Sequence, residues 1–186
     1  MAKVVVLLGS PRARGNSTLL AESAARGIAE SGGESYLCRL HGMRIEPCRA
    51  CDSCQKPVGS GCVVRDDMQD LYPRLTSAEA LLVASPIYWF TVSAQTKLFM
   101  DRCYALHVPG GHAFAGKRIG LILTYGDSDA MASGAINAIR TFQDACRYLE
   151  ADLVGVVHGT AGAAGAVASN TALVDEAYRL GRELAG

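Results

Sequence analysis

A regular alternation of short apolar segments with segments of helical length is the feature that most constrains the fold. Runs rich in Val, Ile and Leu without polar alternation are typical of strands buried on both faces. Five strands are expected, at residues 3–9, 34–40, 80–85, 118–124 and 152–158. Helices are expected at residues 16–31, 68–77, 92–106, 133–149 and 171–184. Such alternation needs right-handed crossovers, so we predict a parallel sheet with helices on both faces and ligands at the carboxyl ends of its strands.

Length and composition exclude several classes of protein. The chain has 186 residues, 49% of them hydrophobic, and we expect one domain, residues 1–186. Its 18 basic residues balance 18 acidic ones, so no net field favours nucleic acid or an anionic membrane. The apolar runs are far shorter than the roughly 20 residues that span a bilayer, and no secretion signal is evident. We therefore expect a cytoplasmic protein without nucleic-acid or membrane partners.

Four of the seven cysteines lie in a loop at residues 41–67, after the second strand: Cys48, Cys51, Cys54 and Cys62. Thiolates at this spacing suit an iron–sulfur cluster or zinc, and three cysteines at successive two-residue intervals favour a [4Fe-4S] cluster. Free or reversibly oxidised thiols are the third interpretation. Arg49 and Arg65 are expected to favour the thiolate form. The other three are expected in the core: Cys38, Cys103 and Cys146.

The loop after the first strand is rich in hydroxyl, amide and guanidinium groups and leads into a helix. Asn16 or Ser17 is expected to cap this helix. Its free backbone N–H groups favour a phosphate, with Ser10 and Thr18 as further donors and Arg12 or Arg14 adding charge. The loop has neither a Walker lysine nor the G-x-G-x-x-G spacing. The alternative is a capped helix with surface arginines.

The third and fourth strands are each followed by residues suited to a planar ligand. Only 6% of the chain is aromatic, yet Tyr88, Trp89 and Phe90 are consecutive. They predict a flat apolar wall, with core packing or a subunit interface as the alternative. Thr124 to Ser128 offer backbone amides and hydroxyls for a polar edge. A phosphate cradle, a ring-binding wall and a polar edge together favour a phosphorylated planar cofactor, and FMN fits this combination best.

Three segments, GSPRARGNSTLL, SPIYWFTVSAQTKLFMDR and FAGKRIGLILTYG, resemble those of flavodoxin-like NAD(P)H-dependent FMN reductases. The insertion CRACDSCQKPVGSGCVVRDDM resembles the iron–sulfur flavoprotein branch of that family. The resemblance implies a three-layer α/β, flavodoxin-like, doubly wound parallel five-stranded sheet in the order 2-1-3-4-5, bound FMN, and a homodimer or homotetramer. It implies phosphate contacts at Ser10, Arg12, Asn16, Ser17 and Thr18. It implies flavin contacts at Pro86, Ile87, Tyr88, Trp89, Phe90, Thr124, Tyr125 and Gly126.

The function expected from these features is FMN-dependent oxidation and reduction. NAD(P)H would give a hydride to FMN, which would then reduce a flavin, quinone or similar acceptor; no side chain is assigned a catalytic role, because the cofactor is the reactive group. The alternative is an iron–sulfur flavoprotein that passes electrons between a [4Fe-4S] cluster, FMN and a ferredoxin-type protein. A further alternative is a non-enzymatic flavodoxin-like carrier or a thiol redox sensor.

Overall fold

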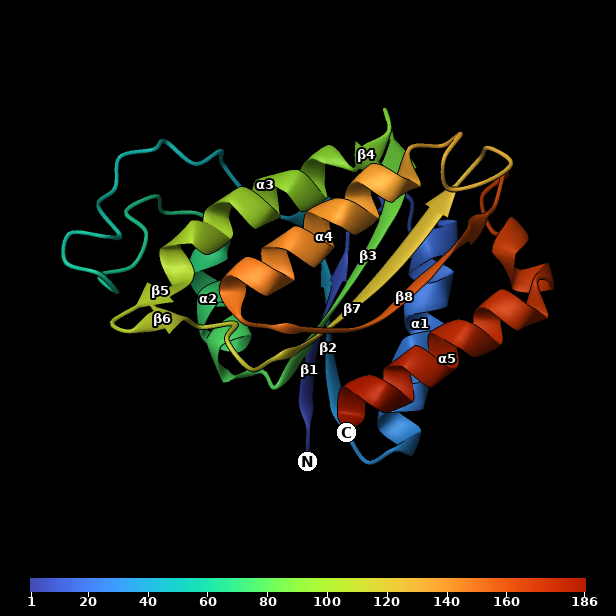
Figure 1. Ribbon diagram of the computed structural model, residues 1–186, viewed down its shortest axis with the longest axis horizontal. Coiled ribbons are helices and arrows are strands. Elements are labelled where there is room, and N and C mark those ends of the chain that lie inside the picture. Colours follow the sequence, from blue (N-terminus) through green and yellow to red (C-terminus); the bar gives the residue numbers. More distant parts are fainter.

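A five-stranded parallel sheet crosses the molecule in the computed structural model, which describes residues 1–186 (Figure 1). Its strands are β1 (Lys3–Leu8), β2 (Glu34–Arg39), β3 (Ala80–Tyr88), β7 (Arg118–Tyr125) and β8 (Asp152–Thr160). They lie in the order β2-β1-β3-β7-β8. Counted along the chain, this is 2-1-3-4-5, the doubly wound order of flavodoxin-like folds. The predicted fold class is confirmed.

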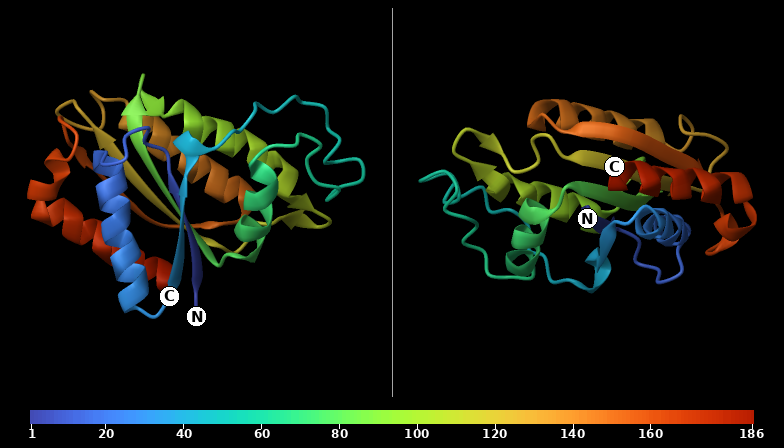
Figure 2. Two further views of the ribbon diagram at one scale, coloured as in Figure 1. Left: turned by 180° about the vertical axis from the view of Figure 1, so that it is seen from behind. Right: turned by 90° about the horizontal axis from the view of Figure 1, so that it is seen from below.

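Helices cover both faces of this sheet and complete three layers (Figures 1 and 2). They are α1 (Asn16–Glu30), α2 (Met68–Ser77), α3 (Ala94–Arg102), α4 (Ala135–Leu149) and α5 (Thr171–Ala185). One hydrophobic cluster joins α1 and α5 to the sheet, and a second joins α2, α3 and α4 to its other face. No helix is both long enough and apolar enough to cross a membrane.

Residues of β1 show why its sequence is apolar throughout. Val4 and Val6 belong to the cluster under α1 and α5, whereas Val5 and Leu7 belong to the cluster on the opposite face. Both faces of the strand are therefore buried, as expected for a central strand in a parallel sheet. The three cysteines predicted in the core are buried, and burial raises the pKa of two thiols, Cys38 and Cys146, to about 11.

Helices α1 and α5 pack at very short range. A Cβ atom built on Gly181 of α5 would lie 1.9 Å from the carbonyl oxygen of Ala24 in α1. One built on Gly27 of α1 would lie 2.2 Å from the carbonyl oxygen of Tyr178 in α5. These two glycines allow the backbones to approach more closely than any side chain permits.

Several element boundaries differ from the sequence prediction. The N-cap of α1 is Gly15, so the prediction that Asn16 or Ser17 caps this helix is wrong. Strand β3 continues beyond Pro86, which is tolerated because the neighbouring β1 ends at Leu8, opposite Ala84. It then folds back on β4 (Thr91–Val92).

Short elements also interrupt the predicted helix at residues 92–106. After α3 the chain forms a 3₁₀ turn, η2 (Cys103–Leu106), and a hairpin of β5 (His107–Val108) and β6 (Gly111–His112). Two further 3₁₀ turns are η1 (Leu40–Gly42) and η3 (Ala166–Ser169). The cysteine-rich insertion follows β2 as predicted and has no strand or α-helix of its own (Figure 1).

Candidate functional site

The loop between β1 and α1 leaves several hydrogen-bond donors without partners. Ser17 is fully buried, and its hydroxyl has no hydrogen-bond partner. The backbone N–H groups of Asn16, Ser17 and Thr18 have no acceptor in the protein, because they belong to the first turn of a helix. A buried hydroxyl beside three free N–H groups is an arrangement that an anion satisfies.

Other residues predicted for this loop contact one another. The backbone N–H of Arg12 donates to Oγ of Ser10 at 3.2 Å, and the hydroxyl of Thr18 donates to the carbonyl of Arg12 at 3.5 Å. Ser10 and Thr18 are buried, whereas Arg12 and Arg14 are exposed. The loop is thus held in shape by its own hydroxyls, with guanidinium groups on its outer side.

The side chain of Asn16 forms hydrogen bonds within the protein. Its amide Nδ2 donates to the carbonyls of Ala161 at 3.2 Å and Ala163 at 3.0 Å, and its Oδ1 accepts from the N–H of Val167 at 3.1 Å. These three bonds join the start of α1 to the loop after β8. The side chain of Asn16 therefore shapes the site, and its backbone N–H is the group left free.

The aromatic residues after β3 line an open cavity of about 530 Å³. Trp89 and Phe90 form the tight turn between β3 and β4, with φ angles of 48° and 65°, a conformation that is strained for bulky side chains. Asn137 stabilises the turn by donating to the carbonyl of Phe90 at 3.2 Å. Trp89 is 91% exposed and Phe90 is 54% exposed. The cavity is lined by Ile87, Tyr88, Trp89, Phe90, Tyr125, Gly126, Asp127 and Ser133.

The end of β7 supplies the polar side of this cavity. Thr124 is buried and is not among the lining residues, whereas Tyr125 lines the cavity. The hydroxyl of Tyr125 lies 2.9 Å from Nδ1 of His158 on β8. Burial and the nearby Asp129 raise the pKa of Tyr125. The loop is held by the hydroxyl of Thr160, which donates to the carbonyl of Asp127 at 2.8 Å.

The loop between β1 and α1 and the aromatic turn lie at the same edge of the sheet, where β1, β3 and β7 end (Figure 1). The N–H of Gly9 donates to the carbonyl of Ala84 at 2.8 Å, which joins the two strand ends. Ser93, the N-cap of α3, donates to the carbonyl of Gly9 at 2.7 Å. The structure thus brings together the two groups of residues that the sequence singles out in these loops.

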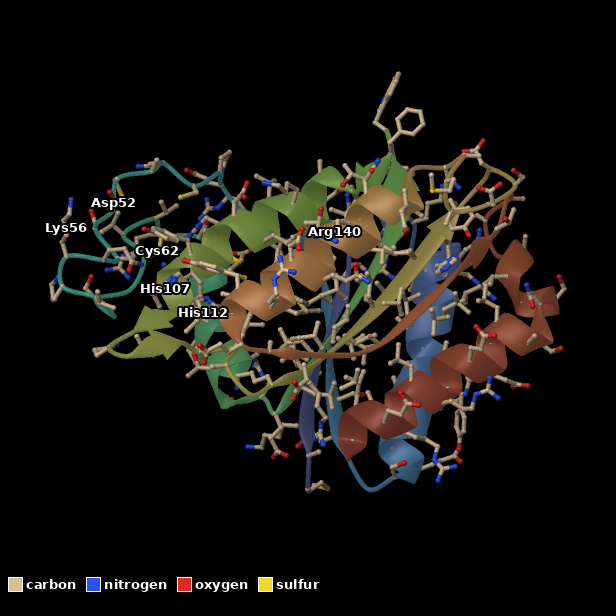
Figure 3. All side chains as sticks on the ribbon, viewed as in Figure 1. Asp52, Lys56, Cys62, His107, His112 and Arg140 are labelled. Atoms are coloured by element: carbon tan, nitrogen blue, oxygen red, sulfur yellow. The ribbon has the colours of Figure 1, made fainter.

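The cysteine-rich insertion lies along the far end of α3 (Figures 1 and 3). Its four cysteines line one cavity of about 20 Å³: Cys48, Cys51, Cys54 and Cys62. Two sulfurs accept hydrogen bonds, Cys54 from Nε2 of Gln55 and Cys62 from Nη2 of Arg102, both at 3.4 Å. Nowhere do three His, Cys, Asp or Glu side chains converge on one point. Four thiols around one cavity match the ligand set of an iron–sulfur cluster in number and in donor atom.

The Arg102–Asp66 pair is the feature of this site that the sequence does not reveal. Arg102, in the last turn of α3, is only 1% exposed and forms an ion pair with Asp66. Of the two arginines expected beside the thiols, Arg49 lines the same cavity and forms an ion pair with Glu46. Arg65 is not among the lining residues and donates to Gln69. The sequence could have indicated the burial of Arg102, though not its partner, because Arg102 follows the buried Phe99 by three residues and so lies on the packed side of the helix.

The fold and the site together define a flavodoxin-like protein with an anion cradle and a ring-sized cavity at one sheet edge. The NADPH-dependent FMN reductase family matches residues 2–160, and the chain belongs to this family.

Relatives agree with the family, and a solved structure agrees with the fold. An iron-sulfur flavoprotein from Archaeoglobus fulgidus is 36% identical over 160 residues, which cover 86% of this chain and 78% of the relative. The iron-sulfur flavoprotein MJ1083 from Methanocaldococcus jannaschii is 36% identical over 106 residues, 57% of this chain, and the match spans about half (54%) of that relative. The solved structure of an NAD(P)H:quinone oxidoreductase from Methanothermobacter marburgensis has a TM-score of 0.70 at 18% identity, covering 98% of each chain.

Proposed function

We propose that the chain binds FMN and transfers reducing equivalents from NAD(P)H to a flavin, quinone or similar acceptor. The observation that carries the proposal is the buried, unpartnered hydroxyl of Ser17 beside three free N–H groups, at the same sheet edge as the aromatic-walled cavity. FMN, when bound, supplies the chemistry, since it accepts a hydride and afterwards gives up its electrons.

The first task of the chain is to hold the phosphate. Ser17 and the N–H groups at the start of α1 would donate to it, as would the hydroxyls of Ser10 and Thr18 after small rotations. Arg12 would add positive charge from the solvent side. Asn16 would act through its backbone N–H, while its side chain fixes the loop.

The second task is to orient the ring and keep one of its faces open. Pro86 to Phe90 would form the apolar wall, and Thr124 to Gly126 would address the polar edge of the ring with backbone groups and hydroxyls. The cavity opens to solvent, and the exposed Trp89 stands at its rim. With one face of the ring open, the nicotinamide and the acceptor would bind at that face in turn.

Replacing Ser17 tests the phosphate cradle. Ser17→Ala is expected to weaken FMN binding by about 10- to 100-fold, because a hydrogen bond to a charged group is worth about 1.5–3 kcal/mol. Flavin fluorescence titration of the apoprotein measures this change. Ser23→Ala is the matched control, since Ser23 is a buried serine of the same helix that bonds to the carbonyl of Val174. Equal FMN affinity in the two variants would refute the assigned phosphate site.

The four thiols around one cavity favour a second function, an iron–sulfur flavoprotein that exchanges single electrons with a ferredoxin-type protein. The name of the Archaeoglobus relative supports the same proposal. The thiolates of Cys48, Cys51, Cys54 and Cys62 would be the ligands, and a [4Fe-4S] cluster would supply one-electron steps.

Anaerobic purification with iron, sulfide and absorption analysis tests the cluster. About four irons per chain are expected, and Cys54→Ser is expected to lose them while keeping FMN, because the two sites lie at opposite ends of α3. Cys146→Ser changes a core cysteine of α4 and is expected to keep the iron. A wild-type protein with FMN and no iron would leave the NAD(P)H-dependent reductase as the function and exclude the cluster.

A further inference from the structure

We propose that Arg102 is the positioning residue of the iron–sulfur site: its buried guanidinium closes the base of the cysteine loop before the cluster arrives and raises the reduction potential of the bound cluster. This inference rests on the iron–sulfur function proposed above. Arg102 lies outside the cysteine motif, in the last turn of α3. The N-terminus of the same helix lies at the proposed FMN site.

The guanidinium of Arg102 joins the two ends of the loop. Nη1 donates to the carbonyl of Glu46, before the first cysteine, at 2.8 Å. Nη1 and Nη2 also donate to the carboxylate of Asp66, which follows the last cysteine. Asp66 in turn accepts from the N–H groups of Glu46 at 2.9 Å and Met68 at 3.1 Å. One side chain therefore fixes both stems of a loop that has no regular structure, and the entropy of closing the loop is lost before a ligand binds.

Arg102 also reaches the thiols themselves. Its Nη2 donates to Sγ of Cys62 at 3.4 Å, and the residue lines the same cavity as all four cysteines. Its Nε is buried and has no hydrogen-bond partner. A planar guanidinium with one donor on a thiol and another still free is suited to donating additional hydrogen bonds to sulfur ligands or sulfides.

The charges around the guanidinium of Arg102 predict whether it raises or lowers the reduction potential of the cluster. Asp66 balances the charge of Arg102, and the hydroxyl of Tyr72 donates to the carbonyl of Arg102 at 3.1 Å, which fixes the end of α3. Hydrogen bonds to the sulfurs of a cluster stabilise its more negative, reduced form and raise its potential. Removal of the guanidinium leaves Asp66 without its cation and is expected to lower the potential.

The test uses the full chain with Arg102→Met, Arg102→Lys and Arg65→Met. Lysine keeps the charge but lacks the planar fork that holds Glu46 and Asp66 together. Arg65 is an exposed arginine of the same loop outside the cavity, so its replacement is the matched control. The readouts are hydrogen exchange of residues 46–66 in cluster-free protein, iron and sulfide content, and the midpoint potential of the cluster in an anaerobic dithionite titration followed by electron paramagnetic resonance.

We expect Arg102→Met to exchange residues 46–66 at least tenfold faster than wild type, to load less iron and to show a lower midpoint potential. Arg102→Lys is expected to restore part of the potential but not the slow exchange, and Arg65→Met to match wild type in all readouts. If Arg102→Met does not fold, Arg102→Lys alone tests the proposal. Hydrogen exchange of residues 46–66 as slow as in wild type, together with a wild-type midpoint potential, would overturn it.

Failure of the iron–sulfur function is separable from failure of this inference. A wild-type chain without iron refutes the function and with it the effect on the potential, yet hydrogen exchange of the cluster-free loop still measures its closure by Arg102. Wild-type exchange in both Arg102 variants would show that this residue does not position the loop.

Discussion

Gly181→Ala is expected to lower the free energy of unfolding by about 3 kcal/mol or more, the upper range for overpacking a core. In an ordinary helix the same change stabilises by about 1 kcal/mol, because alanine is the better helix former. Here the added methyl group would lie 1.9 Å from the carbonyl oxygen of Ala24, and backbone atoms cannot rotate away as a side chain would. Helices α1 and α5 would have to separate, which would open the hydrophobic cluster between them and the sheet.

Urea denaturation followed by circular dichroism measures this change. Gly42→Ala is the control, because a Cβ atom on Gly42 would meet nothing within 4 Å. We expect its free energy of unfolding to stay within about 0.5 kcal/mol of wild type. A Gly181→Ala variant as stable as wild type would contradict the close contact between α1 and α5.

The second large effect is expected for Asp66→Ala, which leaves Arg102 as a buried cation without its partner. Breaking one side of a buried ion pair typically lowers the free energy of unfolding by about 3–5 kcal/mol. Denaturant unfolding of the cluster-free chain is the measurement. Asp144→Ala removes the partner of the exposed Arg140 and Arg147 and is expected to lower it by no more than about 1 kcal/mol. Equal effects in the two variants would refute the buried pair.

Lowering the pH should reproduce, in the wild-type chain, part of the loss in the free energy of unfolding expected for Asp66→Ala. Burial raises the pKa of Asp66, but the hydrogen bonds from Arg102, Glu46 and Met68 outweigh burial, so the pKa lies below its ordinary value. A carboxyl whose pKa is lowered on folding stabilises the folded state above its unfolded pKa. This stabilisation is lost as the pH falls through the folded pKa, and the Asp66→Ala variant should lack that part of the acid dependence.

The central strands and most helices follow from local sequence because burial determines them. The apolar run of β1 requires two covered faces, and the structure supplies a hydrophobic cluster on each. The strand ends are less predictable. β3 extends past Pro86 because its neighbour has already ended, and that information lies in a strand nearly eighty residues away.

In the candidate site, too, the local sequence predicts some features, whereas others depend on contacts between distant residues. The sequence identifies Ser17 and Asn16 as polar residues of one loop, but only the fold shows that Asn16 bonds to the loop after β8 while the hydroxyl of Ser17 stays free. The pairing of Arg102 with Asp66 joins residues 36 positions apart and has no local signature. Tertiary pairing of this kind decides which polar residues remain for a ligand.

The direction of α3 makes its two ends electrically unequal. A helix carries a dipole whose positive end is the N-terminus, and in α3 this end lies against the loop between β1 and α1, where Ser93 contacts Gly9. The negative end lies against the cysteine cavity, where it opposes the charge of thiolates. Arg102, in the last turn, places a cation at this negative end, where the dipole favours positive charge. The dipole of this nine-residue helix thus favours negative charge at the loop between β1 and α1 and disfavours it at the thiols, where the positive charge of Arg102 offsets the dipole.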